Sequence, residues 1–354
     1  MVFGFSILGI FGISVVLYHI LLTVDVEDWF QVENFKPWIP LSSWDSRELR
    51  VEKNTHRLLD LFDETRVQGS GFTVQGSSAL SSSLPAPRSR LGRLAPDDRP
   101  PTADHGQWTR NNGQRTTDHG PDEKVHATFF VLGWLAERLP HLVYEVRARG
   151  HEVASHGYGH ELCSQCPAGS LKEDLVKSRK LLEDIIGDRV YGYRAPSFSV
   201  SDAVLRVIAG AGYRYDSSYN SFGLHGRYGK ISTGGSTKKG IAHLMSQDFY
   251  ELPISNLTLG KKTFPFGGGA FFRMLPAALF RFGVRRILEK QGAYVFYVHP
   301  WELDPEQPRV KEASAGARFK HYSNLGRTHQ RLARLIERFS DCRFVTCTDY
   351  LELR

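Results

Sequence analysis

Residues 21–29 read Leu-Leu-Thr-Val-Asp-Val-Glu-Asp-Trp, an uncharged run that ends in three acids within four positions, Asp25, Glu27 and Asp28. No charged residue precedes Asp25, and the apolar run predicts a buried strand that ends at the acids. Alternation along a strand places Asp25 and Glu27 on one face, and Asp28 can turn toward them where the strand ends. Carboxylates this close repel one another unless a cation or an arginine lies between them. The segment therefore predicts a ligand site at the end of a strand.

Strand and helix patterns alternate along the rest of the chain. Apolar residues recur at helical spacing over Thr55 to Phe62 and over Leu171 to Ile186. Ser170 with Glu173 predicts a capping box at the start of the second helix, and Gly187 predicts its C-terminal cap. Runs rich in β-branched and aromatic residues predict further strands at Ala127 to Leu132, Glu152 to Ser155, Tyr213 to Tyr215, Tyr294 to Val298 and Arg343 to Thr346. This alternation favours a mostly parallel sheet covered by helices, either a barrel or an open sheet.

The composition changes abruptly between about Arg66 and Asp122. This stretch is rich in Ser, Gly, Pro, Arg and Asp and lacks periodic apolar residues. We expect residues 66–122 to be a low-complexity, disordered surface insertion that separates a helix from the next strand. Deleting Val67 to Pro121 is expected to cost about 1 kcal/mol or less, because loop-closure entropy depends only weakly on loop length.

The first 19 of the 354 residues form an apolar N-terminal extension, about the minimum length of a membrane span. Its length allows an anchor or a signal, whereas the lack of a basic n-region and of an A-x-A-like cleavage site favours a mis-assigned start. The sequence therefore leaves an anchor, a signal and a mis-assigned start open. The location of the protein is accordingly left open between cytoplasmic and membrane-associated. The formal net charge of +7 comes from scattered basic residues, which argues against a nucleic-acid partner. The four cysteines are too few for a disulfide framework, and Cys163 and Cys166 are interpreted as two thiols in a loop.

Three other polar segments follow predicted strands, where parallel α/β proteins form their ligand sites. His156 and His160 are four residues apart and can reach one cation across a helical turn or a Gly-rich bend. Two histidines and one carboxylate leave open positions for water, as a catalytic metal requires. Arg194, two residues before a proline, is placed to hold a carboxylate by a bidentate bond. His299 ends an apolar strand and could face the same site.

These four segments, in this order, resemble the motifs of carbohydrate esterase family 4, the NodB-homology polysaccharide deacetylases. The H-[ST]-x-x-H motif of that family corresponds to His156–His160, with Gly157 in place of Ser or Thr, and its R-x-P loop to Arg194–Pro196. The acidic motif T-V-D-V-E-D-W departs from the common T-F-D-D-G. It is similar to that of a subgroup associated with exopolysaccharide and PEP-CTERM (exosortase) gene clusters, as is the phrase Phe319-Lys320-His321-Tyr322.

The resemblance covers about residues 21–351 apart from the insertion. It implies an α/β fold, a distorted (β/α) barrel that forms one deacetylase domain over residues 20–354, with a C-terminal extension over about residues 267–354. It also implies one divalent metal ion, with zinc expected, and an N-acetylated polysaccharide as the partner. The implied activity is that of a hydrolase acting on carbon–nitrogen bonds other than peptide bonds, which removes N-acetyl groups from amino sugars of an exopolysaccharide or cell-wall glycan.

The implied metal ligands are His156, His160 and one carboxylate, either Glu27 or Asp28. Strand alternation favours Glu27, whereas a turn after Val26 favours Asp28. The ion would polarise the acetamide carbonyl and acidify its bound water.

The resemblance also implies the catalytic groups. Asp25 would remove the proton of the attacking water, and His299 would protonate the departing amine. Arg194 would orient Asp25, and Asp216 would polarise His299 or Arg194. A backbone N–H near Ser197 would stabilise the oxyanion.

Two other classes of function stay open on the sequence: an amidohydrolase acting on a non-sugar amide, and a catalytically inactive carbohydrate-binding protein. The residues that line the pocket distinguish an amidohydrolase of this kind from a deacetylase of sugars. Aromatic residues beside the motifs favour a groove on which sugars stack, but aromatic side chains are also common in cores, and the sequence favours neither interpretation over the other. These residues are Trp29, Phe30, Tyr193, Phe198 and Trp301.

Overall fold

The computed structural model describes residues 17–69, 120–223 and 226–354, and gives no side-chain description for residues 68–69 and 121–123. Within these ranges, ten strands form one sheet. They are β1 (His19–Val26), β4 (Ala127–Val131), β5 (Glu152–Ser155), β6 (Gly192–Tyr193), β7 (Tyr215–Asp216), β8 (Thr237–Lys239), β9 (Ala242–Ser246), β10 (Phe249–Glu251), β13 (Ala293–Val298) and β14 (Arg343–Phe344). Two small two-stranded sheets pair β2 (Arg66–Gly69) with β3 (Gly120–Lys124) and β11 (Leu257–Leu259) with β12 (Lys262–Phe264).

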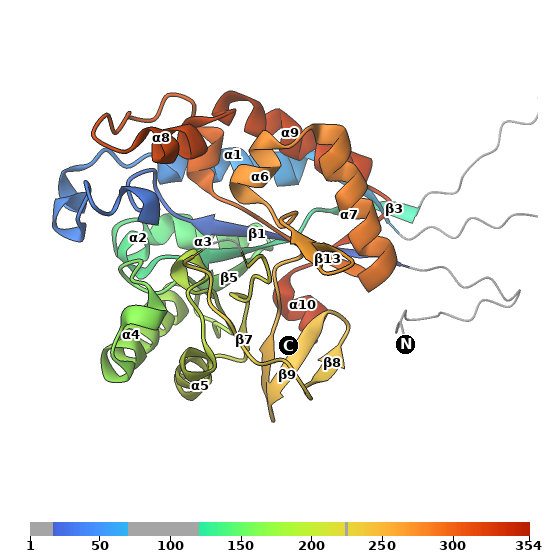
Figure 1. Ribbon diagram of the computed structural model, residues 1–354, viewed down its shortest axis with the longest axis horizontal. Helices are drawn as coiled ribbons and strands as arrows, with labels where there is room; N and C mark the ends of the chain where they lie inside the picture. The colour runs from blue at the N-terminus through green and yellow to red at the C-terminus, as the bar shows by residue number, and fades with distance from the viewer. Residues whose placement is uncertain (1–16, 70–119, 224–225) are drawn as a thin grey trace, which may run out of the picture.

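The large sheet runs in the order β13-β1-β4-β5-β6-β7-β10-β9-β8, and β14 pairs with β1 beside this path. Neighbours from β13 to β10 are parallel, and the last two pairs are antiparallel. The described strands thus form a curled, open α/β sheet, a half-barrel, in agreement with the predicted distorted barrel (Figure 1). The region after Gly267, expected as an extension, supplies β13, which pairs with β1 along its whole length.

Helices cover the sheet. They are α1 (Val51–Glu64), α2 (Gly133–Arg138), α3 (Pro140–Ala148), α4 (Ala168–Ile186), α5 (Asp202–Gly210), α6 (Gly269–Met274), α7 (Ala277–Gln291), α8 (Ala315–Tyr322), α9 (Leu325–Arg338) and α10 (Cys347–Leu351). In Figure 1, α1, α6, α7, α8 and α9 lie together above the sheet, and α4, α5 and α10 lie below it. Within the described ranges, no helix is both long enough and apolar enough to cross a membrane. Residues 1–16 of the predicted N-terminal extension lie outside the described residues.

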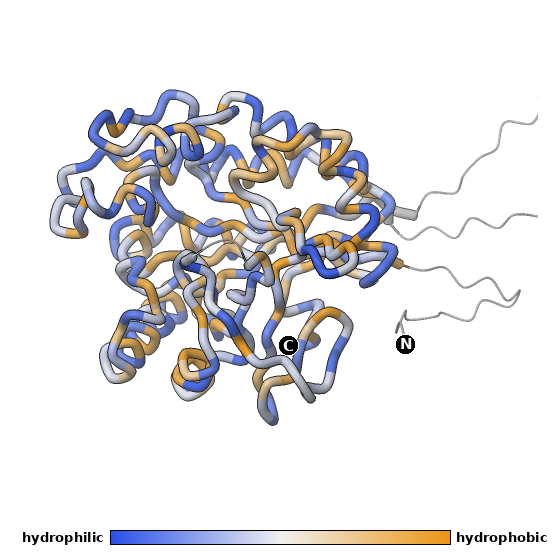
Figure 2. Tube along the Cα trace, in the orientation of Figure 1, coloured by the Kyte–Doolittle hydropathy of each residue, from blue (hydrophilic) through white to orange (hydrophobic). Residues whose placement is uncertain are grey.

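Strand alternation divides β1 between two environments. Leu22 and Val24 pack into the larger apolar cluster beneath the helices, whereas Leu21 joins a smaller cluster on the opposite, concave face. Thr23 and Asp25 follow Leu21 on that concave face and are fully buried. The hydrophobic colouring of Figure 2 follows the central strands. The sequence of β1 therefore places polar groups inside the curl of the sheet.

The two ends of α4, the second predicted helix, show one correct prediction and one error. Gly187 caps α4 in the left-handed conformation, with φ 65°, as predicted. The capping box is wrong, because α4 begins at Ala168 after Pro167 and Ser170 lies inside the helix. A proline before the first turn starts this helix without a side-chain cap.

The predicted insertion begins and ends in ordered structure. β2 and β3 pair antiparallel, with Gly69 opposite Gly120, and Val67 packs in the main apolar cluster. The predicted start at residue 66 is therefore too early, because Val67 is buried and its strand pairs with β3 through a backbone ladder. The rest of the insertion, residues 70–119, lies outside the described residues.

We expect that replacing residues 70–119 with an Asn-Gly turn leaves folding and activity nearly intact, because Gly69 and Gly120 already lie opposite each other. The change in stability should be about 1 kcal/mol or less, measured by urea denaturation. Deletion of residues 67–121 is the contrasting variant: it removes the buried Val67 and should cost roughly 1.5–3 kcal/mol. Failure of the first variant to fold would contradict the prediction.

Candidate active site

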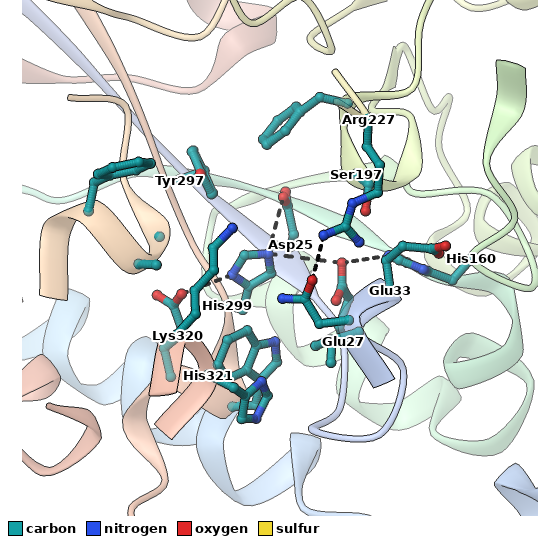
Figure 3. Close-up of a pocket in the computed structure, with 18 of the residues that line it drawn as sticks. Asp25, Glu27, Glu33, His160, Ser197, Arg227, Tyr297, His299, Lys320 and His321 are labelled. Atoms are coloured by element: carbon teal, nitrogen blue, oxygen red, sulfur yellow. Dashed lines mark hydrogen bonds and ion pairs between the residues drawn. The ribbon is translucent and has the colours of Figure 1, made fainter. Parts of the chain in front are cut away.

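A concave pocket lies at the carboxyl ends of β1 and β13 (Figure 3). Four of the predicted site residues line it: Asp25, Glu27, His160 and His299. Ser197 also lines it, from the loop that follows β6. The sheet topology explains this gathering, because β1 lies between β13 and β4 and the parallel strands end at the same edge.

Glu27, His156 and His160 form a compact group of buried donor atoms. Glu27 Oε1 lies 3.0 Å from Nε2 of His156 and 3.0 Å from Nε2 of His160. Ligand atoms about 2.0–2.1 Å from a tetrahedral zinc ion lie about 3.3 Å from one another, so this spacing suits one ion. Within the described ranges, this is the place where three His, Cys, Asp or Glu residues bring their donor atoms close enough together to share a metal ion.

The hydrogen-bonding state of His156 supports a cation at this place. Its Nδ1 lies 2.7 Å from the carbonyl oxygen of Arg194, which can only accept, so Nδ1 carries a proton. If His156 is neutral, the lone pair of its Nε2 faces Oε1 of Glu27, and the two lone pairs repel each other. Protonating both histidines would instead place two imidazolium rings with centroids 5.5 Å apart. A bound divalent cation resolves both conflicts, so these residues fit the expected ion.

Electrostatics act on Glu27 in opposite directions. Burial raises its pKa, but the charge of His160 and hydrogen bonds with His156 and His160 outweigh burial and hold the pKa well below its ordinary value. Glu27 is therefore kept as the carboxylate that a metal ion requires.

Asp28 has a different task. Its carboxylate accepts hydrogen bonds from the backbone N–H groups of Trp29, Arg50 and Val51. Two of these groups belong to the start of α1, so Asp28 ties the end of β1 to that helix. Between the two carboxylates that the sequence left open, the geometry places Glu27 at the histidines and Asp28 at the helix.

We expect Glu27→Gln and Asp28→Ala to separate these tasks. Glu27→Gln should lose bound zinc while the protein stays folded, because it removes a charged ligand that supports no helix. Asp28→Ala should retain zinc and lose about 1–3 kcal/mol of stability, because it leaves buried N–H groups without their acceptor. Zinc content by elemental analysis and urea denaturation give both readouts. Loss of zinc in Asp28→Ala with full zinc in Glu27→Gln would reverse the assignment.

Arg194 directly follows β6, the third strand along the sheet from β1, and holds Asp25 in place. It is fully buried, and its Nη1 donates to Asp25 Oδ1 and to Thr23 Oγ1, both at 2.7 Å. The expected bidentate bond is wrong: Nε and Nη2 donate instead to the carbonyl and hydroxyl oxygens of Ser217. The guanidinium thus spreads its donors over three residues, and one nitrogen fixes the orientation of Asp25.

His299 faces the same two carboxylates from β13. Its Nε2 lies 3.8 Å from Asp25 Oδ2 and 4.0 Å from Glu27 Oε1, and its Nδ1 lies 3.4 Å from Glu302 Oε1. Burial lowers the pKa of His299, but the negative charges of Glu27, Glu302 and Asp25 outweigh it and raise the pKa to about 9. The ring stacks on Trp301, with centroids 5.2 Å apart.

Asp216 lies behind the site and not against His299. It accepts hydrogen bonds from the hydroxyl and N–H of Ser218, and the Ser218 hydroxyl oxygen accepts from Ala195 N. Burial raises the pKa of Asp216, and burial together with Asp216 raises the pKa of Glu251 well above its ordinary value. Asp216 therefore bonds Ser218, and Ser218 in turn accepts from the backbone N–H of Ala195, the residue after Arg194. These hydrogen bonds reach neither His299 nor Arg194, but the charge of Arg194 lowers the pKa of Asp216 against the effect of burial, so an electrostatic interaction with Arg194, one of the two expected partners, is present.

Two backbone features shape the site. Gly157 has φ 75°, and a Cβ there would meet Asp174 Oδ1 at 3.2 Å and Tyr193 OH at 3.3 Å. The departure from the family's Ser or Thr therefore fits this bend, across which both histidines reach Glu27. Ser197 has φ 52°, a left-handed conformation that is uncommon for a residue with a side chain and typical of functional loops.

The aromatic residues divide into two groups. Trp29, Phe30 and Tyr193 pack in the larger apolar cluster, so of the two interpretations the core one holds for them. Phe198 and Trp301 line the pocket. The pocket also contains residues to which the sequence assigned no role, namely Glu33, Asn34, Arg227, Tyr228, Phe271, Arg273, Tyr297, Glu302, Lys320 and His321. Of these residues, Lys320 and His321 lie in the segment Phe319–Tyr322, whose similarity to the subgroup was the one sequence feature that could have pointed to the pocket.

The fold and the site define a class: an α/β half-barrel with a His-His-carboxylate donor set beside an aspartate and a histidine. Comparison with known proteins narrows the class. Residues 101–215 match the polysaccharide deacetylase family, and residues 217–352 match a domain of unknown function, DUF3473.

Three of the curated relatives that this chain matches are named as deacetylases. A peptidoglycan-N-acetylglucosamine deacetylase of Bacillus cereus is 30% identical over 124 residues, 30% of this chain and 58% of the relative. A peptidoglycan deacetylase of Helicobacter pylori is 33% identical over 104 residues, 28% of this chain and 36% of the relative. A chitooligosaccharide deacetylase of Sinorhizobium fredii is 34% identical over 92 residues, 26% of this chain and 43% of the relative. The chain thus spans less than two thirds of the length of these relatives.

Among solved structures, a protein of Mycobacterium smegmatis assigned as a polysaccharide deacetylase superposes with a TM-score of 0.52 at 16% identity. The match covers 95% of this chain and 89% of that one, and at this identity it shows the fold. Together the family match and the relatives support a polysaccharide deacetylase domain in this chain.

Proposed function

We propose that this protein is a metal-dependent deacetylase that hydrolyses N-acetyl groups on the amino sugars of a glycan. One observation carries the proposal: the donor group Glu27, His156 and His160 lies in the same site as Asp25 and His299, which suit a base and an acid. The names of the relatives support the reaction class. The resemblance of the acidic motif to the exopolysaccharide-associated subgroup favours an exopolysaccharide as the glycan.

Amide hydrolysis needs a water to lose a proton and an amine to gain one. A divalent ion held by Glu27, His156 and His160 supplies Lewis acidity toward the amide carbonyl and the water. Asp25 accepts the proton of the water at Oδ2 while Arg194 holds Oδ1 at 2.7 Å. The water oxygen forms a bond to the carbonyl carbon, the C–N bond then breaks as the nitrogen takes up a proton, and acetate and the amine leave.

His299 is placed to donate the second proton. Its Nε2 lies 3.8 Å from the proposed base, close enough to serve the same substrate from the opposite side. Glu302 lies against Nδ1, at 3.4 Å, and favours the protonated ring. Trp301 stacks on the ring and fixes its plane.

We expect His299→Gln to lower kcat for N-acetyl sugars on the order of 10²-fold or more, because an amine leaves poorly unless it is protonated. The same variant should lose less than about tenfold on 4-nitrophenyl acetate, since a nitrophenolate leaves without a proton. Zinc content and thermal stability serve as controls for a structural role of His299. If the variant loses the same factor in kcat on both substrates, His299 is not the proton donor.

The experiment that tests the proposed function is acetate release from N-acetylglucosamine oligomers by the zinc-loaded protein. We expect release to stop on treatment with a chelator and to return when zinc is added. Asp25→Asn loaded with zinc is the matched control, because it retains the ligands and lacks the base. Release that persists in the chelated protein would overturn metal dependence, and release by Asp25→Asn at the wild-type rate would overturn the mechanism.

A further inference from the structure

The outer surface of α7 and α9 gathers arginines far from the pocket. An open groove between these two helices is lined by four arginines, two acids and one serine: Arg281, Arg285, Arg334, Arg338, Glu337, Asp341 and Ser340. Asp341 pairs with Arg285 at 3.3 Å. Arg327 and Arg331 extend the basic side of α9, because residues four, seven and eleven positions apart lie along one face of a helix. This surface therefore carries an excess of positive charge.

The position of Arg331 shows how closely the positive charges lie together. Its guanidinium donates to the carbonyl oxygen of Leu275 at 2.7 Å and lies over the ring of Phe272. Burial lowers the pKa of Arg331, and the like charges of Arg281 and Arg327 lower it further. A surface on which cations repel one another is attractive to a partner that carries many negative charges.

Exposed apolar side chains lie beside the arginines. Phe282 and Leu279 are 58% and 47% exposed on α7, next to Arg281. The hairpin of β11 and β12 contacts α7 and carries exposed lysines at its turn, Lys261 and Lys262. Of the ten large apolar side chains that are exposed in the described ranges, five belong to residues 259–282: Leu259, Phe264, Met274, Leu279 and Phe282. Such clustering marks an interaction surface, whereas single exposed apolar residues do not.

The apolar N-terminal run enters the fold beside the ends of both helices. The carbonyl oxygen of Gly292, the residue that caps α7, accepts a hydrogen bond from His19 N at 3.0 Å. The carbonyl oxygen of Tyr18 accepts one at 2.9 Å from the N–H of Arg343, shortly after the end of α9. The 24 residues before Asp25 include no Asp, Glu, Lys or Arg. An uncharged apolar segment thus meets a surface that is both basic and apolar.

An anionic lipid bilayer fits this surface better than two other partners do. A second copy of the chain, paired about a two-fold axis, would bring the same arginines against each other, which is repulsive. A soluble polyanion would neutralise the arginines but leave Phe282 and Leu279 in water. The headgroup region of a bilayer accommodates both kinds of side chain, because anionic headgroups attract arginines and the acyl boundary accepts apolar groups.

We propose that α7, the arginine face of α9 and the β11–β12 hairpin form a docking surface for an anionic lipid bilayer. Phe282 and Leu279 enter the acyl boundary, and the arginines contact the headgroups. His19 begins β1 and Asp25 lies near its other end, so the chain enters this surface at the end of the strand opposite the pocket. The inference is independent of the proposed function, because it uses no residue of the proposed active site.

Co-sedimentation of the full-length protein with lipid vesicles tests the surface. We expect binding to mixed phosphatidylcholine–phosphatidylglycerol vesicles to be about tenfold or more tighter than to phosphatidylcholine vesicles. This preference should disappear near ~1 M salt, where the Debye length falls to about 3 Å. The double variant Arg334→Gln with Arg338→Gln should bind the anionic vesicles about tenfold or more weakly, and Phe282→Ser about tenfold more weakly.

Matched variants on other surfaces serve as controls. Lys172→Gln with Lys180→Gln removes two exposed charges from α4, which lies across the sheet from α7 and α9 (Figure 1). Tyr144→Ser removes an aromatic side chain that is 61% exposed on α3. Both control proteins should bind anionic vesicles as the wild type does, and acetate release from soluble oligomers should be the same in every variant.

Three results would overturn the docking surface. Equal binding to neutral and anionic vesicles would assign membrane contact to apolar insertion alone. Wild-type binding by the α9 double variant would exclude the arginines. Arginine-dependent retention on heparin without binding to anionic vesicles would assign the groove to a soluble polyanion. None of these results depends on deacetylation, so loss of the proposed function and loss of the docking surface are distinguishable.

Discussion

Replacing Asp25 with Asn should lower kcat/KM for acetate release on the order of 10²- to 10⁴-fold while bound zinc is retained. The amide oxygen of Asn can still accept the bond from Arg194 Nη1 that Asp25 Oδ1 accepts at 2.7 Å, so the local geometry should persist. What the variant lacks is a group that can accept a proton. Acetate release, zinc content and thermal stability measured on the same preparation check the prediction.

The buried charge of Arg194 is the main risk in this experiment. Arg194 is fully buried, and removing its anionic partner leaves a charge in a low-dielectric site, which can cost about 3–5 kcal/mol. Its bonds to Thr23 and Ser217 remain in the variant and limit that cost. Asp25→Glu is the second variant: it keeps the charge and moves the base, so it should fold normally and stay slow. A folded, zinc-loaded Asp25→Asn protein with normal turnover would exclude Asp25 as the base.

His156→Ala and His160→Ala should each lower the zinc content from about one ion per chain to near zero, with acetate release falling to background. Each change removes one of three donors whose atoms lie within 4.8 Å of one another, and two donors hold zinc far more weakly than three. His156→Ala should also loosen the loop after β6, because its Nδ1 bonds the carbonyl of Arg194 at 2.7 Å. The two variants are therefore expected to agree in zinc content and to differ in stability.

His141→Ala is the matched control for these two variants. His141 is exposed and lies beside Glu52 on the surface, so its loss should change neither zinc content nor activity. Elemental analysis after dialysis against zinc-free buffer provides the measurement. Full zinc occupancy in both His156→Ala and His160→Ala would end the assignment of this site as a metal centre.

Local patterns in the sequence predicted much of the fold. The uncharged run before Asp25, the segment Glu152 to Ser155 and the glycine at position 187 all predicted elements that the structure contains. These signals are local, because strand alternation, burial and a left-handed helix cap each depend on a few neighbouring residues. The same reasoning failed at Ser170, where a proline three residues earlier had already started the helix.

The sequence also determined which residue types gather at the site, because parallel strands end at one edge of a sheet. Only the tertiary structure decided between Glu27 and Asp28: the helix that Asp28 caps begins 23 residues later, and His156 lies 129 residues from Glu27. It likewise decided that Arg194 divides its donors between Asp25 and Ser217, and that Arg227 and Lys320 share a pocket. The physical reason is that these contacts depend on the curl of the sheet and the paths of long connections, whereas a sequence pattern reports only periodicity and near neighbours.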